Sequence, residues 1–259
     1  MADEELNMGG FGFHLIGAGR GGTSLIAGLI DSHPDCEVCF EQLSAGFLMG
    51  RAPTDAETIQ NSTIRASLRI RNFMEACETH AAKVPDKLWG HKTTTEHIAA
   101  LSWPASTDAS KNKEHPLSGD CLDFFVSSLS RVPTIFIVRD GRTCVRSKVN
   151  RTGQPLNLAI EGWKFSIRVL SALRASHERL LVVKFEDLVV SPRQVLPQVC
   201  NFLNVAYKEE MLRGTNSPKM LPDYRSDSFD HSKLEFEDKG EQWVADLRGE
   251  LALAGYLAE

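Results

Sequence analysis

Residues 13–34 read FHLIGAGRGGTSLIAGLIDSHP, and this stretch decides the fold that the chain is expected to take. A short apolar run over 13–18 is typical of a buried strand, and residues 23–32 have the apolar content of a helix that ends before Ser-His-Pro. Between them lies a glycine-rich turn that follows the phosphate-loop pattern G-x4-G-x-[ST], in which amides at a helix N-terminus bind an anion. Thr23 stands where a nucleotide triphosphatase has its lysine, and Arg20 occupies the middle of the turn.

We expect five residues of this loop to hold one anionic group: Arg20, Gly21, Gly22, Thr23 and Ser24. The missing lysine disfavours a kinase or ATPase, which uses it on the outer phosphates, beside a hydroxyl and an acidic residue that hold magnesium. The loop alone leaves two other interpretations open. One is a glycine-rich turn without a ligand. The other is a G-x-G-x-x-G dinucleotide site, for which Glu37 and Glu41 are the acidic candidates.

Further apolar runs alternate with amphipathic segments along the chain. Strands are expected over 36–40, 87–92, 133–140 and 179–188, and helices over 56–82, 93–101, 141–151, 158–178, 191–203 and 239–257. This alternation predicts one α/β domain over residues 1–259, a three-layer, P-loop-like fold with a parallel sheet covered by helices on both faces. The ligand should lie at the carboxyl ends of the strands. Residues 1–10 are expected to be flexible, 106–120 to be a loop, and 204–235 to be an irregular segment that covers the substrate or nucleotide.

The amino-acid composition disfavours some classes of binding partner. The 259 residues are 42% hydrophobic and carry 29 Lys+Arg against 34 Asp+Glu, a net charge of -5, which disfavours nucleic acid as a partner. The acidic N-terminus and the lack of a long apolar run predict a cytoplasmic protein without a membrane partner. Six cysteines are scattered, and Cys36-Glu-Val-Cys39 has no second pair, so ordinary thiols are favoured over a metal or redox site.

A second motif, FIVRDGRTCVRSKVNR, spans residues 136–151. Arg139 ends a predicted buried strand, and Ser147 and Arg151 are four residues apart on one face of the helix expected to follow. These three side chains are therefore expected to bind a second anion, with Asp140 as a helix cap or ion-pair partner. The alternative is a solvated basic helix that presents Arg142, Arg146 and Lys148.

Two anion sites at two strand ends resemble those of the sulfotransferases that use 3′-phosphoadenosine 5′-phosphosulfate (PAPS). The runs Arg20–Asp35 and Val138–Arg151 are most similar to the tyrosylprotein sulfotransferases, and residues 182–205 resemble their later strand–YExL–helix segment. The resemblance implies a single sulfotransferase domain that uses PAPS as co-substrate, needs no metal, and transfers its sulfuryl group to a hydroxyl acceptor. The loop would hold the 5′-phosphosulfate, and the second motif would hold the 3′-phosphate.

Individual roles follow from the same resemblance. Arg20 would stabilise the leaving oxygen, Glu41 would be the general base, and Lys92 would support the transition state. Phe185 would contact the nucleotide where the family has a tyrosine, and Ser226 or Ser228 would fill a serine role.

Several alternatives stay open at this point. Glu41 can be a surface carboxylate and Lys92 a solvated turn residue, with His91 as the second candidate base. The acceptor can be a tyrosine of a peptide, a carbohydrate or a small molecule. A magnesium-dependent phosphoryl transferase and a non-catalytic nucleotide-binding protein are the competing functions, and whether the chain forms a homodimer is undecided.

Overall fold

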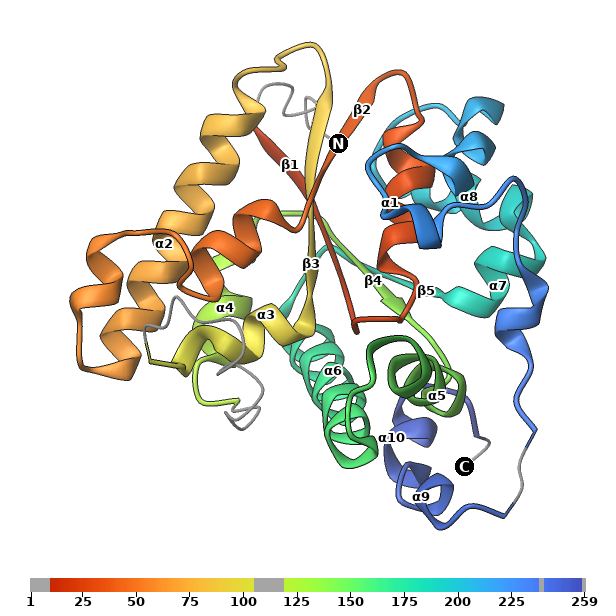
Figure 1. Cartoon of the computed structure of the whole chain (residues 1–259). Helices are drawn as coiled ribbons and strands as arrows, with labels where there is room; N and C mark the ends of the chain where they lie inside the picture. Colours follow the sequence, from red (N-terminus) through yellow and green to blue (C-terminus); the bar gives the residue numbers. More distant parts are fainter. Residues whose placement is uncertain (1–9, 105–118, 238–239, 258–259) are drawn as a thin grey trace.

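Five parallel strands form one sheet within residues 10–104, 119–237 and 240–257, the part of the chain that the computed structural model describes. The strands lie in the order β2-β3-β1-β4-β5 (Figure 1), and they are β1 (Phe11–Gly17), β2 (Cys36–Phe40), β3 (Leu88–Thr94), β4 (Thr134–Val138) and β5 (Leu180–Lys184). Central β1 pairs in register with both neighbours, so that Leu15 lies beside Lys92 of β3 and Ile135 of β4. The expected parallel sheet is confirmed, whereas the expectations for 1–9 and 106–118 concern residues outside the described ranges.

Helices cover both faces of this sheet (Figure 1). On one face lie α2 (Ser62–Ala81), α4 (Leu122–Ser128) and α6 (Leu156–Ser176); on the other lie α1 (Thr23–Asp31), α7 (Phe185–Val190) and α8 (Pro192–Phe202). Side chains alternate along each strand and supply two separate cores. In β4, Ile135 and Ile137 pack with the α1 layer, and Phe136 packs with the α2 layer. The three-layer α/β fold is therefore confirmed.

The remaining α-helices of the described ranges are α3 (Thr95–Ala99), α5 (Gly141–Thr152), α9 (Gln242–Ala245) and α10 (Arg248–Leu253). Helix α5 begins directly after β4, because the carboxylate of Asp140 accepts the N–H of Arg142 at 2.8 Å as an N-cap, and Asp140 also pairs with the Arg142 guanidinium. The helix ends at Gly153, whose φ of 65° suits glycine. The expected role of Asp140 as cap and ion-pair partner is thus confirmed.

Several element boundaries differ from the sequence-based expectation. The strand predicted over 179–188 ends at Lys184, since Phe185 opens α7 with two acidic residues in its first turn. The helix predicted over 56–82 begins only at Ser62, where Asn61 caps it, and a 3-10 helix covers Asp55–Thr58. In place of one helix over 239–257, the chain turns between α9 and α10. The segment 204–235 contains three 3-10 helices, Glu209–Asn216, Pro222–Tyr224 and His231–Leu234.

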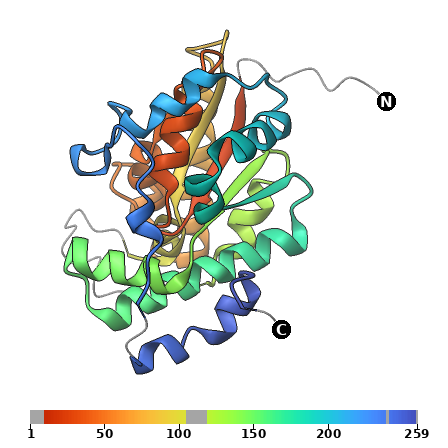
Figure 2. The same cartoon turned by 90° about the vertical axis from the view of Figure 1, so that its right-hand side faces the viewer.

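The segment after α8 runs past α1 and across the carboxyl ends of the strands before it reaches α9 (Figure 2). Two contacts fasten it to the α1–β2 region. The imidazole of His33 lies 2.7 Å from the carbonyl oxygen of Ala206, and the ammonium of Lys219 donates to Asp31 at 2.7 Å. Within the described ranges, no helix combines the length and apolar character needed to cross a bilayer.

Candidate functional site

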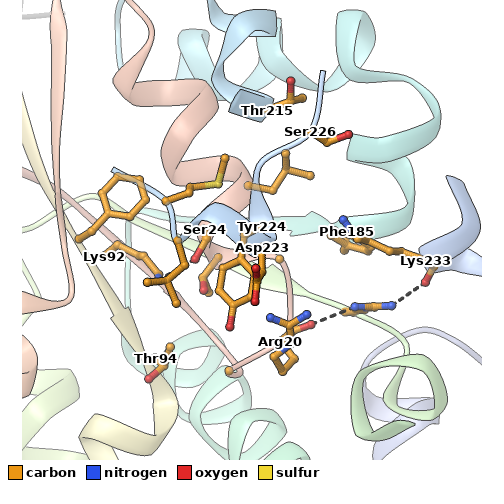
Figure 3. A pocket seen from close by; sticks show the side chains of 18 of the residues that line it. Arg20, Ser24, Lys92, Thr94, Phe185, Thr215, Asp223, Tyr224, Ser226 and Lys233 are labelled. Carbon is orange, nitrogen blue, oxygen red and sulfur yellow. Dashed lines mark hydrogen bonds between the residues drawn. The ribbon is translucent and has the colours of Figure 1, made fainter. Parts of the chain in front are cut away.

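A cavity of about 520 Å³ lies at the carboxyl ends of the strands, under the segment after α8. Ten of the predicted site residues line it: Arg20, Gly22, Thr23, Ser24, Glu41, Lys92, Arg139, Arg151, Phe185 and Ser226. All five strand ends contribute, because parallel strands bring their carboxyl ends to one edge of a sheet. In Figure 3, Lys92 and Ser24 lie at one end of the cavity and Phe185 and Lys233 at the other, with Arg20 and Tyr224 between them.

The loop between β1 and α1 packs too closely for most side chains. A Cβ atom on Gly22 would lie 2.3 Å from the Phe185 ring, and the φ of Gly22 is 98°. Arg20 is held in the left-handed region, with φ at 69°, and the N–H of Gly21 bonds to the carbonyl oxygen of Ala18 at 2.8 Å. This tight turn brings the first turn of α1, whose N–H groups lack partners within the helix, to the cavity. Gly21 shapes the loop but does not line the cavity.

A largely buried ion pair between Glu96 and Lys148 holds the backbone of the loop in place. The N–H of Gly19 donates to both carboxylate oxygens of Glu96, at 3.0 and 3.2 Å, and Glu96 pairs with Lys148 of α5. Burial by itself raises the pKa of Glu96, but Lys148 and the N–H donors lower it below its usual value. Burial lowers the pKa of Lys148, and Glu96 more than offsets this, so that the pKa of Lys148 is raised. Sequence reasoning missed both residues, since Lys148 reads as part of a solvated basic helix.

Lys92 supplies the ammonium group that the loop lacks. Its side chain is almost fully buried, its Nζ donates to Ser24 Oγ at 3.0 Å, and it forms an ion pair with Glu41. The cation therefore reaches the loop from β3, the neighbouring strand, and not from the loop itself. Lys92 is no solvated turn residue, and Glu41, which also lines the cavity, directs its carboxylate to the Lys92 ammonium.

Glu41 occupies a strained backbone position directly after β2. Its φ is 53°, and among the described residues only Arg20 and Asn204 are other non-glycine residues with positive φ. The Glu41 N–H bonds to the carbonyl oxygen of Lys92 at 3.1 Å, and its own carbonyl accepts the hydroxyl of Ser44 at 3.0 Å. Strain of this kind persists when surrounding contacts enforce it and is concentrated at functional sites.

His91, the second candidate base, faces away from this cavity. Successive residues of a strand point to opposite faces, so His91 turns toward α2, where its ring lies 5.1 Å from that of Phe73. Its Nε2 accepts the N–H of Ser44 at 3.4 Å, and burial holds its pKa well below the usual value. A buried neutral imidazole outside the cavity does not fit the role of base, so this alternative is disfavoured.

Arg139 is a buried cation whose direct partners are neutral. Its guanidinium donates to Thr143 Oγ1 at 2.9 Å and to the carbonyl oxygens of Arg20 and Lys233 at 3.0 and 2.5 Å, two contacts drawn in Figure 3. It also stacks on Phe185, with Cζ 4.6 Å from the ring centroid. Burial lowers the pKa of Arg139. A cation with this environment lowers its desolvation cost by binding an anion.

The other two residues predicted for the second anion, Ser147 and Arg151, contact other groups. Ser147 does not line the cavity; its hydroxyl accepts Arg20 Nε at 3.3 Å. Arg151 donates to the carbonyl oxygen of Asp223 at 2.8 Å. Arg20 and Arg151 both lie close to Tyr224, whose ring centroid is 4.4 Å from Arg20 Cζ and 6.0 Å from Arg151 Cζ. Each of the three side chains predicted for the second anion therefore bonds to Arg20 or to the segment after α8.

Tyr224 could not be found from the sequence, since it lies in a segment without a recognisable motif. Ser226 and Ser228 both line the cavity, and the N–H of Ser228 lies 3.4 Å from Ser226 Oγ. Phe185, expected to contact the nucleotide without the hydroxyl of the family's tyrosine, lines the cavity and packs against Gly22 and Arg139.

Cys36 and Cys39 point to opposite faces of β2, so they cannot ligate one metal ion together. Cys36 lies in the core beside α1, where burial raises its pKa to about 12. Across the described ranges, no group of three or more His, Cys, Asp or Glu side chains is arranged to hold a metal ion.

Comparison with known proteins adds an independent observation. A curated relative, the protein-tyrosine sulfotransferase of Drosophila melanogaster, is 23% identical over 221 residues, which are 80% of this chain and 41% of the relative's length. The sulfotransferase domain of the Synechococcus PCC 7002 olefin synthase superposes with a TM-score of 0.62 at 19% identity, over 100% of this chain and 99% of that domain. The sulfotransferase domain from the curacin biosynthetic pathway gives 0.60 at 15% identity, over 96% and 99%. At these identities the two structures show a shared fold.

The sequence profile of the Sulfotransferase family matches residues 13–209. This range begins in β1 and contains the loop, Glu41, Lys92, Arg139 and Phe185, the residues that surround the cavity. The chain therefore belongs to the sulfotransferase family.

Proposed function

We propose that this protein transfers a sulfuryl group from PAPS to a hydroxyl acceptor, with Glu41 as general base. The observation that carries the proposal is the convergence of Lys92, Glu41 and Ser24 at one end of a cavity whose other end holds Arg139. One end offers the groups for transfer, and the other offers a buried cation for a second phosphate.

The proposed step is an in-line displacement. The acceptor oxygen forms a bond to sulfur while the bond from sulfur to the bridging oxygen of PAPS breaks, and Glu41 accepts the acceptor's proton. The products are the sulfate ester and adenosine 3′,5′-bisphosphate. Arg20 and Lys92 provide positive charge where negative charge develops, and preorganised charge of this kind is effective in a buried site.

Two features disfavour a magnesium-dependent phosphoryl transferase. In that class the loop hydroxyl and an acidic residue after a strand hold the metal. Here the Ser24 hydroxyl faces the Lys92 ammonium at 3.0 Å, and Asp140 caps α5 and pairs with Arg142. A non-catalytic nucleotide-binding protein is disfavoured by the strained Glu41, which such a protein has no reason to retain.

Nucleotide choice tests the proposal. Adenosine 3′,5′-bisphosphate is expected to bind in the presence of a chelator and more tightly than ATP or 5′-AMP, because Arg139 favours a second phosphate. Arg139→Ala should weaken this binding by about 1.5–3 kcal/mol, the range for hydrogen bonds to a charged group. Isothermal titration calorimetry measures both effects.

Arg146→Ala is the matched control for that experiment. Arg146 lies on the same α5 region but pairs with Glu241 and lies outside the cavity, so its loss should leave nucleotide affinity unchanged. Equal affinity for 5′-AMP and the bisphosphate would remove the second anion site from the proposal.

Arg20→Ala is expected to lower turnover by about 10²–10³-fold, the usual loss for one preorganised stabilising donor, with a smaller effect on nucleotide affinity. Arg20 lines the cavity between its two ends, and Ser147 and the Tyr224 ring hold its guanidinium in place. Steady-state kinetics and calorimetry on the same preparation separate the two effects. Near-normal turnover would show that Arg20 only shapes the loop.

A further inference from the structure

An apolar wall lies where an acceptor would approach Glu41. It consists of four cavity-lining side chains, which we call the acceptor wall: Leu25, Phe40, Met220 and Leu221. We propose that the acceptor is a small uncharged alcohol or phenol with a hydrocarbon body, bound by this wall with its hydroxyl toward Glu41. The inference rests on the proposed function and specifies its substrate class.

Contacts of neighbouring residues place the wall beside the transfer end. Phe40 immediately precedes Glu41, and its ring centroid is 5.7 Å from Lys92 Nζ. Lys219 is fastened to the α1–β2 region through Asp31 and the Val38 carbonyl oxygen, at 2.7 and 3.2 Å.

Five residues further on, the Tyr224 ring stacks on Arg20. Met220 and Leu221 therefore lie on the stretch that crosses from the end of β2 to the loop.

Leu221 is the most informative member of the wall. It is 62% exposed, and it is the one large exposed hydrophobic residue of the described ranges that lines this cavity. Met220, its neighbour, is only 3% exposed. An uncovered leucine at the rim of a binding cavity is a surface that an apolar ligand can cover.

Both cavity-lining lysines beside the wall have acidic partners, Glu41 for Lys92 and Asp31 for Lys219. The cavity-lining arginines Arg20 and Arg151 lie against Tyr224 instead. An acidic peptide would need cations without such partners.

A sugar would bring several hydroxyls against carbon atoms, and burying hydroxyls without hydrogen bonds is unfavourable. Both features favour a hydrocarbon body over a carbohydrate or an acidic tyrosine peptide.

The test is a series of 4-alkylphenols from phenol to 4-butylphenol, measured with PAPS for kcat/KM. Each added methylene should raise kcat/KM by roughly three- to fourfold, the value for burial of one methylene group, until the wall is covered. Glucose, N-acetylglucosamine and an acidic tyrosine peptide serve as competitors. The inference is overturned if kcat/KM does not rise with alkyl chain length, or if any competitor has a higher kcat/KM than 4-butylphenol.

Three variants connect the series to the wall. Leu221→Ser should reduce the increase of kcat/KM with chain length and lower kcat/KM for 4-butylphenol by roughly tenfold, a larger loss than for phenol. Leu221→Met should keep the increase of kcat/KM with alkyl chain length. Leu253→Ser is the matched control, because Leu253 is 60% exposed on α10 and lies outside the cavity. An unchanged slope in Leu221→Ser contradicts the assignment of the wall.

A binding measurement separates failure of the inference from failure of the proposed function. The same phenols are titrated into protein loaded with adenosine 3′,5′-bisphosphate, where no transfer takes place. Affinity that rises with chain length and depends on Leu221, without sulfation of any acceptor, would support the wall and overturn the transferase proposal. Affinity independent of chain length would overturn the inference even if transfer occurs.

Discussion

Glu41→Gln is expected to lower turnover by about 10²–10⁴-fold and to leave affinity for adenosine 3′,5′-bisphosphate nearly unchanged. The amide keeps the shape of the side chain but cannot accept the acceptor's proton. Stopped-time assays with one good acceptor, together with calorimetry, measure these effects.

Two further variants separate a base from a residue that merely holds Lys92. Lys92→Met removes the ion pair but keeps the carboxylate, so this variant should be slower than wild type but faster than Glu41→Gln. His91→Asn should cost far less turnover than Glu41→Gln, because His91 lies outside the cavity and burial keeps its pKa well below the usual value. A large loss of turnover in His91→Asn with near-normal turnover in Glu41→Gln would transfer the role of base to the histidine.

Lys148→Met is expected to lower the free energy of unfolding by about 3 kcal/mol at pH 7, since it leaves a carboxylate without its partner in a largely buried position. Glu96 would then hold the Gly19 N–H less firmly, and nucleotide affinity should fall as well. The double variant Glu96→Gln/Lys148→Met should recover part of the stability, because neither member is left charged. Lys83→Met, at an exposed position after α2, should change it by less than about 0.5 kcal/mol. Urea denaturation measures all four proteins.

The pH dependence of this stabilisation follows from the direction of the two pKa shifts. The pKa of Glu96 is lowered in the folded protein, so its contribution is present above its ordinary pKa and is lost as pH falls through the lowered value. The pKa of Lys148 is raised, so its contribution is present below its ordinary pKa and is lost as pH rises through the raised value. The stability difference between wild type and Lys148→Met should therefore be constant near neutrality and shrink in acid. A difference that grows in acid would contradict the assigned pairing.

The pattern of residues 13–34 was enough to predict the strand, the tight loop and the helix of the β1–α1 unit, because each depends on neighbours in the chain. The short apolar runs likewise predicted the parallel sheet, since such runs between helices can be buried only when both faces are covered. The predicted ends of helices and strands were wrong where local sequence signals conflict. Phe185 is apolar and therefore predicts that the strand continues, but the acidic residues after it favour the start of a helix.

For the site, the sequence identified ten residues that line one cavity, because parallel strands bring distant motifs to the same edge of a sheet. Only the tertiary structure showed that Lys92 reaches Ser24, that Glu96 and Lys148 support the loop, and that His91 faces the core. The contacts of Lys92 with Ser24, of Glu96 with Gly19 and of Lys148 with Glu96 join residues 52 to 77 positions apart, and no local pattern specifies them. The acceptor wall belongs to the same class: Leu221 is an ordinary leucine in the sequence, and it becomes part of a site because the segment after α8 folds back across the strand ends.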